Sequence, residues 1–166
     1  EYGRMWRSMT LDASRAATIR AVAKRIHANI HRYLAIEAET GVPASFVAVA
    51  NERESGGRFD RYLGNGQVLT KRTTIVPKGR GPFLNHPDDV TPGNDAWTRG
   101  CLDALIDCAP FAANWSDWSI GGVLTLWEEY NGLGYAARGV PSAYVWSGTD
   151  QYVSGKYVAD HVYRSN

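Results

Sequence analysis

The sequence predicts a mainly α fold with a small β element, and three observations support this. Three stretches of the chain repeat apolar residues at three- and four-residue steps, and a fourth stretch is apolar almost all round. Gly, Pro, Asn and Thr are concentrated in residues 58–94 instead, where we expect a loop or short hairpin. The chain has 166 residues, of which 44% are hydrophobic, so we expect one domain over residues 1–166 with a substantial core.

The first expected helix covers residues 10–40. Thr10 or Asp12 can cap its start, and Gly41 with Pro43 after it ends the helical pattern. Its basic residues fall largely off the apolar stripe, so they indicate a solvated face or, alternatively, a face that attracts an anionic polymer. The stripe that we expect to be buried consists of Ile19, Val22, Ile26, Ile30, Tyr33 and Leu34.

A second helix is expected to begin at Pro43, whose fixed φ suits a first helical turn, and to end near Gly56 and Gly57. The residues before Asn51 are apolar almost all round, so we expect this helix to be buried at the centre of the fold. It brings Glu54 to its C-terminal end, where the core opens.

Residues 58–94 are expected to form a loop or hairpin excursion. A turn is predicted over residues 63–67 and a short strand over residues 73–76, followed by a loop around residues 77–82. A loop of this length inside a compact domain often carries function.

Two further helices are expected at residues 95–109 and 119–130, each stopped by a proline or by glycines. The tail from residue 135 mixes aromatic residues, glycines and short polar runs. We therefore expect irregular structure there, with a last helical piece near residues 156–163.

Composition and charge exclude several function classes. A net charge of +1 is too small to predict a nucleic-acid partner, and no apolar run is long enough for stable membrane insertion. Cys101 and Cys108 would lie roughly 10 Å apart on one helix, too far for a disulfide, so we expect buried thiols. The histidines do not cluster with them, and we expect neither a metal nor another cofactor. The start at Glu1 rather than Met is compatible with an upstream segment.

Glu54 is the strongest candidate for a catalytic residue on chemical grounds. Cleavage of a glycosidic bond needs a carboxylic acid that stays protonated near neutral pH and donates its proton to the leaving oxygen. Apolar surroundings and the negative end of a helix dipole both disfavour a charged carboxylate, and both would raise the pKa of Glu54. A solvated or ion-paired Glu is the simpler alternative for this position taken alone.

Two segments at expected helix ends carry motifs. Residues 41–56 run from Gly-Val-Pro through an apolar stretch to Arg-Glu-Ser-Gly, and residues 129–134 read Glu-Tyr-Asn-Gly-Leu-Gly. Together they resemble the lysozyme-like superfamily, in particular lytic transglycosylases and goose-type lysozymes, in which a helix ends in a catalytic Glu-Ser and a Tyr-Asn-Ala-Gly motif borders the cleft opposite. The resemblance implies a lysozyme-like helical domain, with the excursion flanking the cleft and Glu54 as the acid.

The resemblance extends from about residue 41 onward. Short segments within residues 65–80, 144–148 and 155–158 look like phage and prophage endolysin-type proteins. One segment departs from the family, because transglycosylases carry a Gly-Leu-Met-Gln-type segment shortly after Glu-Ser. Residues 62–67 read Tyr-Leu-Gly-Asn-Gly-Gln there, and only the last Gln could replace part of that segment.

A second carboxylate would be needed by an inverting hydrolase, whereas a transglycosylase needs none. Asp60 follows a Gly pair six residues after Glu54, and we prefer it to Glu52, which lies on another helix face. Glu128 and Glu129 are further candidates. A surface carboxylate is the simpler interpretation of Asp60 and Glu52.

The family motifs also suggest supporting residues. Tyr130 is expected to hydrogen-bond the catalytic acid or the reacting sugar. For Asn131, which follows it, helix capping is the simpler role. For Tyr144 and Trp146 in the tail, packing in the core is the simpler role. Thr73 and Arg80 could also meet the glycan or its peptide stem. The expected substrate-binding residues are Ser55, Asn65, Gln67, Thr70, Asn131, Tyr144 and Trp146.

The resemblance thus implies an enzyme, a peptidoglycan-degrading glycosidase that cleaves the β-1,4 bond between N-acetylmuramic acid and N-acetylglucosamine. It would act as a muramidase or a lytic transglycosylase, as a monomer, on peptidoglycan glycan strands. A phage or prophage protein of this kind is made in the bacterial cytoplasm and acts on the cell wall in the periplasm. The alternatives are a non-catalytic wall-binding module with the same cleft, and a chitinase or chitosanase.

Overall fold

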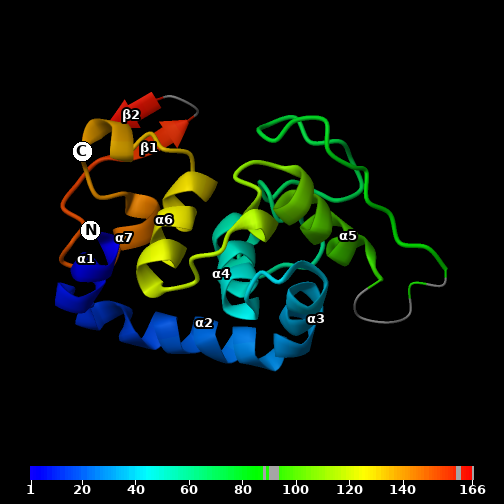
Figure 1. Ribbon diagram of the computed structural model, residues 1–166, viewed down its shortest axis with the longest axis horizontal. Helices are drawn as coiled ribbons and strands as arrows, with labels where there is room; N and C mark the ends of the chain where they lie inside the picture. The colour runs from blue at the N-terminus through cyan, green and yellow to red at the C-terminus, as the bar shows by residue number, and fades with distance from the viewer. Residues whose placement is uncertain (88, 90–93, 160–161, 166) are drawn as a thin grey trace. The chain divides into compact units, whose positions relative to one another are not determined.

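The computed structural model of the chain describes residues 1–87, 89, 94–159 and 162–165, and this part of the chain is mainly α (Figure 1). Its α-helices are α1 Tyr2–Ser8, α2 Ala16–Ala28, α3 Ile30–Thr40, α4 Ala44–Ser55, α5 Ala96–Leu102, α6 Ile120–Tyr130 and α7 Ala143–Trp146. Shorter helical segments are the 3-10 turns Ala13–Arg15, Ala112–Asn114 and Ala136–Arg138 and the π-helical segment Asp103–Asp107. The strands β1 Lys156–Ala159 and β2 Val162–Arg164 pair antiparallel.

The chain forms two compact units. The terminal unit consists of Glu1–Arg20 and Ser116–Asn166, and the central unit consists of Ala21–Trp115. Glu54 therefore belongs to the central unit and Tyr130 to the terminal unit. The single catalytic domain expected from the sequence stays a prediction.

The core of the central unit is built around α4. Helix α3 packs against both α4 and α5. Phe46 and Val47 of α4 are buried, as are Tyr33 of α3 and Trp97 of α5. Phe59, just after α4, closes this aromatic cluster, with its ring centroid 4.9 Å from that of Trp97. The apolar area buried here stabilises the helix that carries Glu54.

In the terminal unit, α6 packs against α1 and α7 (Figure 1). Gly3 of α1 faces Gly121 of α6 where the two helices pack. Trp146 of α7 stacks on Tyr2 of α1, with ring centroids 6.1 Å apart. Helices α1 and α7, which are far apart in the sequence, thus pack together in the terminal unit.

The expected helix over residues 10–40 is two helices, separated at Asn29. Asn29 leaves helical geometry, with φ −114° and ψ 16°, and its side chain donates to the carbonyl oxygen of Arg25. Competition of an Asn side chain for a backbone carbonyl is a local reason for the break. The stop at Gly41 is confirmed, since this residue caps α3 in the left-handed conformation. The cap at Asp12 is confirmed too, because its side chain accepts from the Ser14 N–H.

The buried stripe predicted for this region is confirmed at Tyr33 alone, because Val22, Ile26 and Ile30 are only half-buried. Ile19 is 44% exposed and Leu34 is 50% exposed, whereas Ile36, outside the stripe, is fully buried. The break at Asn29 changes the phase between the two helices, so a single periodic stripe does not continue across it. Helix α1 is a further element that the sequence pattern did not indicate.

The prediction for α4 is confirmed. Pro43 immediately precedes its first residue, and Gly56 ends it in the left-handed conformation, with its N–H donating back to the last turn. Val49 is the main departure from the expected burial, since it is 40% exposed. The local signals at both ends agree with the packing, which is why the bounds could be predicted.

The strand predicted at residues 73–76 is wrong. The described part of residues 58–94 carries one isolated bridge, between Arg61 and Val68, and is otherwise irregular. The helical piece predicted near residues 156–163 is also wrong, because β1 and β2 form the hairpin there. Alternation of Tyr and Val in these strands favours a β-strand over a helix.

Helix α5 begins after Asp95, whose side chain accepts from the Thr98 N–H, and continues as the π-helical segment. The start of the predicted helix over residues 95–109 is therefore confirmed, and the helical structure ends at Asp107, two residues before the predicted end. Cys101 and Cys108 are free and buried, as expected. None of the described helices is long and apolar enough to cross a membrane.

Candidate active site

Glu54 lies in the last turn of α4 and is half-buried. The helix ends one residue later, and the Gly56 N–H donates to the carbonyl oxygens of Asn51 and Glu52. The last turn of a helix is also the negative end of the helix dipole. The helix-end position predicted for Glu54 is therefore confirmed, and its role as an acid stays a prediction.

Ser55 fixes the end of α4 from within. Its Oγ donates to Asn51 Oδ1 at 2.7 Å and accepts from the Arg58 N–H at 3.2 Å. Asn51 is fully buried and donates through Nδ2 to the hydroxyl of Tyr33 at 3.3 Å. Ser55, expected to bind substrate, is thus part of a hydrogen-bonded chain that holds the helix end.

Gly66 brings a loop directly against the backbone of Glu54. A methyl group at Gly66 would collide with the Glu54 carbonyl oxygen, and the φ of Gly66 is +71°, a conformation that favours glycine. The turn closes on itself, because the Gly66 N–H donates to the Tyr62 carbonyl and the Tyr62 N–H donates to that of Gln67, both at 2.8 Å. Only glycine permits this contact with the candidate acid.

Asn65 and Gln67, both expected to bind substrate, instead join this turn to the next loop. Asn65 Nδ2 lies 3.2 Å from the Ile75 carbonyl oxygen, to which it donates. Gln67 donates through Nε2 to Thr74 Oγ1 at 2.9 Å, and its Oε1 accepts from the Thr74 N–H at 2.7 Å. Their polar atoms are engaged within the excursion, so the structure gives them a positioning role.

Tyr62 anchors the turn in the core of the central unit. It is fully buried, its hydroxyl donates to Asp103 at 2.7 Å, and its ring stacks on Phe83. Burial raises the pKa of Tyr62 most, and its contacts with Cys108 and Asp103 raise it further, so the hydroxyl keeps its proton. Burial likewise raises the pKa of the Cys108 thiol, which is not set up as a nucleophile.

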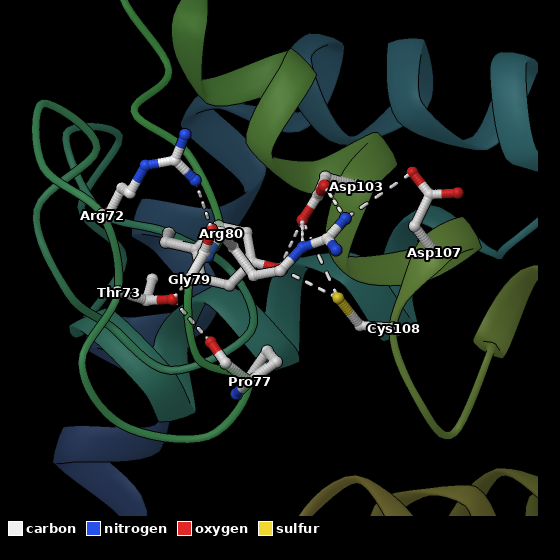
Figure 2. A network of polar contacts seen from close by, with 9 residues as sticks. Arg72, Thr73, Pro77, Gly79, Arg80, Asp103, Asp107 and Cys108 are labelled. Atoms are coloured by element: carbon white, nitrogen blue, oxygen red, sulfur yellow. Dashed lines mark hydrogen bonds and ion pairs between the residues drawn. The ribbon is translucent and has the colours of Figure 1, made fainter.

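Arg80 completes this cluster, as Figure 2 shows. Its guanidinium forms two hydrogen bonds with Asp103, and Asp107 lies 4.0 Å away. The ion pair with Asp103 raises the pKa of Arg80. Thr73, which is buried, accepts from the Arg80 N–H and donates to the Pro77 carbonyl (Figure 2). Thr73 and Arg80, expected to meet substrate, therefore hold the excursion to the π-helical segment.

Asp60, the preferred second carboxylate, forms an exposed ion pair. Both its oxygens accept from Arg58, at 2.8 and 2.6 Å, and Arg61 lies 3.7 Å away. The hydrogen bonds from Arg58 hold the pKa of Asp60 below its usual range, which makes it a weak base. Glu52 is paired with Arg25. The simpler interpretation of both as surface carboxylates is the better supported one.

Glu128 is buried, at 2% exposure, and therefore does not meet substrate as a second carboxylate. Burial raises the pKa of its carboxyl, while hydrogen bonds from Ser142 act in the opposite direction. Ser142 caps α7 by accepting from the Val145 N–H. Glu128 is a structural group that ties α6 to α7, and Glu129 beside it is half-buried.

Tyr130 ends α6 and is half-buried, and Asn131 caps that helix through its own backbone N–H, which donates to the Trp127 carbonyl. The roles expected for the Asn131 side chain, helix capping or substrate binding, stay predictions, as does the role of Tyr130. Tyr144 lies beside Trp127, with ring centroids 6.0 Å apart.

Trp146 is a correction to the predicted site. It is 1% exposed and stacks on Tyr2, so its ring is packed in the core and is not open to a sugar. Thr70 is exposed in a turn of the excursion, and its expected contact with substrate stays a prediction.

Sequence reasoning missed Gly66, Tyr62 and Asp103 as residues of the site. The Asn-Gly-Gln turn signal located the turn but did not identify its partner, because the contact with Glu54 is tertiary. Tyr62 and Asp103 are 41 residues apart, and no local pattern links them.

Comparison with protein-family models, curated proteins and solved structures finds no match for the chain. Among the described residues, no group of three or more His, Cys, Asp or Glu side chains is placed to hold a metal ion. The resemblance to the lysozyme-like superfamily therefore rests on the two sequence motifs.

Proposed function

We propose that the protein is a peptidoglycan-degrading glycosidase that cleaves the β-1,4 bond between N-acetylmuramic acid and N-acetylglucosamine, with Glu54 as the general acid. The observation that carries this proposal is the construction of the α4 end. A half-buried carboxyl lies in the last turn of a buried helix, where Ser55 holds the helix end and Gly66 lies against the Glu54 carbonyl oxygen. An acid held in this way can keep one geometry toward a bound sugar.

In the proposed reaction the Glu54 carboxyl donates its proton to the oxygen that bridges the two sugars. The bond from that oxygen to C1 of the muramic acid breaks, through an oxocarbenium-like transition state. The C6 hydroxyl of the same sugar then attacks C1 and gives its proton back to Glu54, which leaves an anhydro end. This route needs no second carboxylate, and it accords with the engagement of Asp60, Glu52 and Glu128 elsewhere.

The substrate would be peptidoglycan glycan strands. The protein would be made in the bacterial cytoplasm and would act on the cell wall. A phage or prophage origin and a monomeric state belong to the same proposal. The aromatic-rich composition, with six Trp and nine Tyr, is compatible with sugar binding.

Lysis of purified cell wall by Glu54→Gln tests the assignment. The exchange removes the proton donor and keeps the size, so we expect the fold to persist and the release of soluble fragments to be lost. Glu39→Gln is the matched control, because Glu39 is an exposed residue of α3 and should leave lysis unchanged.

Three outcomes would contradict the proposal. Retained lysis by Glu54→Gln would remove Glu54 from the mechanism. Sedimentation of the wild-type protein with peptidoglycan, without release of fragments, would indicate a binding module. Turnover of chitin oligomers without action on peptidoglycan would indicate a chitinase.

A further inference from the structure

The excursion carries an excess of positive charge. From residue 61 to residue 87 the chain contains five Lys and Arg and no acidic residue. Arg61 pairs with Asp60, and Arg80 pairs with Asp103. Lys71, Arg72 and Lys78 are exposed, and the ion pairs found within the described residues involve none of the three.

An apolar tip lies between these cations. Ile75 is 45% exposed and Val76 is 72% exposed, and they are neighbours in the chain. Single exposed apolar residues are common on protein surfaces and need no explanation. Two adjacent ones, flanked by three cations that form no ion pair with the described carboxylates, make up a distinct surface, which we call the basic loop, residues 71–80.

The basic loop is held in shape by its own hydrogen bonds. The Thr73 N–H donates to the Arg80 carbonyl at 3.0 Å, and the Gly79 N–H donates to that of Thr73 at 2.8 Å. Arg72 donates to the Gly79 carbonyl, as Figure 2 shows. Because the backbone closes on itself and Arg80 binds Asp103, the exposure of Ile75 and Val76 is built into the fold.

We propose that the basic loop docks on the surface of an anionic phospholipid bilayer, with Ile75 and Val76 at the acyl boundary and Lys71, Arg72 and Lys78 at the headgroup phosphates. Cations beside a short apolar insertion are the combination that membrane interfaces bind. A hydrated glycan would use the cations but would give the aliphatic side chains nothing to bury. Residues 71–80 also contain no aromatic residue for stacking on a sugar.

Sedimentation with vesicles tests this proposal. Wild-type protein should bind vesicles of phosphatidylglycerol and phosphatidylcholine, should bind less as salt is raised, and should not bind phosphatidylcholine alone. Lys71→Gln with Lys78→Gln should weaken binding about fivefold for each cation removed. Ile75→Ser with Val76→Ser should weaken it about tenfold. Thermal unfolding of each variant reports whether the fold is kept.

Two matched controls separate the loop from the rest of the surface. Arg20→Gln with Lys24→Gln removes the same charge from α2, and Val153→Ser removes a side chain that is 88% exposed elsewhere. Both should bind like wild type, and so should Glu54→Gln, because docking does not depend on the proposed catalysis. Absence of wild-type binding to the anionic vesicles, or equal loss in loop variants and controls, would overturn the proposal. Loop-dependent binding to purified peptidoglycan without vesicle binding would overturn it in favour of a glycan surface.

Discussion

The ends of α4 and α6 carry the two motifs that resemble the lysozyme-like superfamily, and they are built differently. Both ends carry a glycine in the left-handed conformation, Gly56 after α4 and Gly132 after α6, but the end of α4 is also fixed by Ser55 and by the backbone contact of Gly66. At the end of α6, Asn131 and Gly132 donate to carbonyls of their own helix. A methyl group at Gly132 would meet nothing within 4 Å.

The two helix ends differ in how many tertiary contacts hold their backbone. The α4 end is held by residues from three separate segments of the central unit, since the turn of Gly66 is anchored through Tyr62 to Asp103. A proton donor loses efficiency when its geometry varies, so such support is expected around an acid. The backbone of Glu54, the acid in our proposal, is thus held by tertiary contacts on the side of Gly66.

The largest effect is expected from a methyl group at the tight contact. Gly66→Ala should lower the free energy of unfolding by about 3 kcal/mol, because a left-handed alanine and a collision with the Glu54 carbonyl oxygen both cost free energy. Gly132→Ala is the matched variant at the end of α6, with φ +79° and open space, and should cost about 1 kcal/mol. Urea unfolding measures both, and equal losses would remove the distinction between the two helix ends.

Removal of Asp103, the hydrogen-bond partner of the buried Tyr62, should be the next largest effect. Asp103→Ala leaves Arg80 and the Tyr62 hydroxyl without their partner, and should lower the free energy of unfolding by about 2 kcal/mol. Tyr62→Phe removes one hydrogen bond and should cost about 1 kcal/mol. If the anchor positions Glu54, Tyr62→Phe should lower kcat for glycan cleavage with little change in KM. Unchanged kcat would limit the anchor to stability.

Glu128→Gln should change how the free energy of unfolding varies with pH. The size of this change should be smaller than the loss of free energy of unfolding caused by Asp103→Ala. Burial raises the pKa of Glu128 in the folded protein, so the folded state holds this proton to a higher pH than the unfolded state. The contribution of Glu128 to stability is therefore full below the ordinary carboxyl pKa and falls as pH rises from there to the raised pKa. Gln cannot ionise, so the stability of the variant should rise relative to wild type over that window in urea titrations. A constant difference between the two proteins at all pH values would contradict the assignment.

Asp60→Asn should have the smallest effect. Its carboxylate is exposed and paired with Arg58, and an exposed pair of this kind contributes little. Lysis of cell wall by this variant should stay within about twofold of wild type. A loss comparable with that of Glu54→Gln would make Asp60 the second catalytic carboxylate after all.

The parts of the fold that could be predicted are those set by local signals. Pro43 and Gly56 bound α4, and Gly41 ends α3, as their backbone preferences dictate. The break at Asn29 and the burial of Trp146 could not be predicted in this way. Asn lowers helix propensity only modestly, so it does not by itself mark a break, and Trp suits both protein cores and sugar-binding sites.

The candidate site divides in the same way. Glu54 could be placed at a helix end from its neighbours in the chain. The contact with Gly66 and the cluster of Tyr62, Asp103 and Arg80 are tertiary. Several residues that were expected to contact substrate therefore hold the loops near Glu54 in place.

Mass spectrometry of the fragments released from purified peptidoglycan tests the central claim most directly. Wild-type protein should release glycan fragments that end in anhydro-N-acetylmuramic acid, and Glu54→Gln should release none. Reducing ends, heavier by one water, would replace the internal attack by hydrolysis while keeping Glu54 as the acid. Intact glycan strands with the wild-type protein, or the same fragments with Glu54→Gln, would contradict the account.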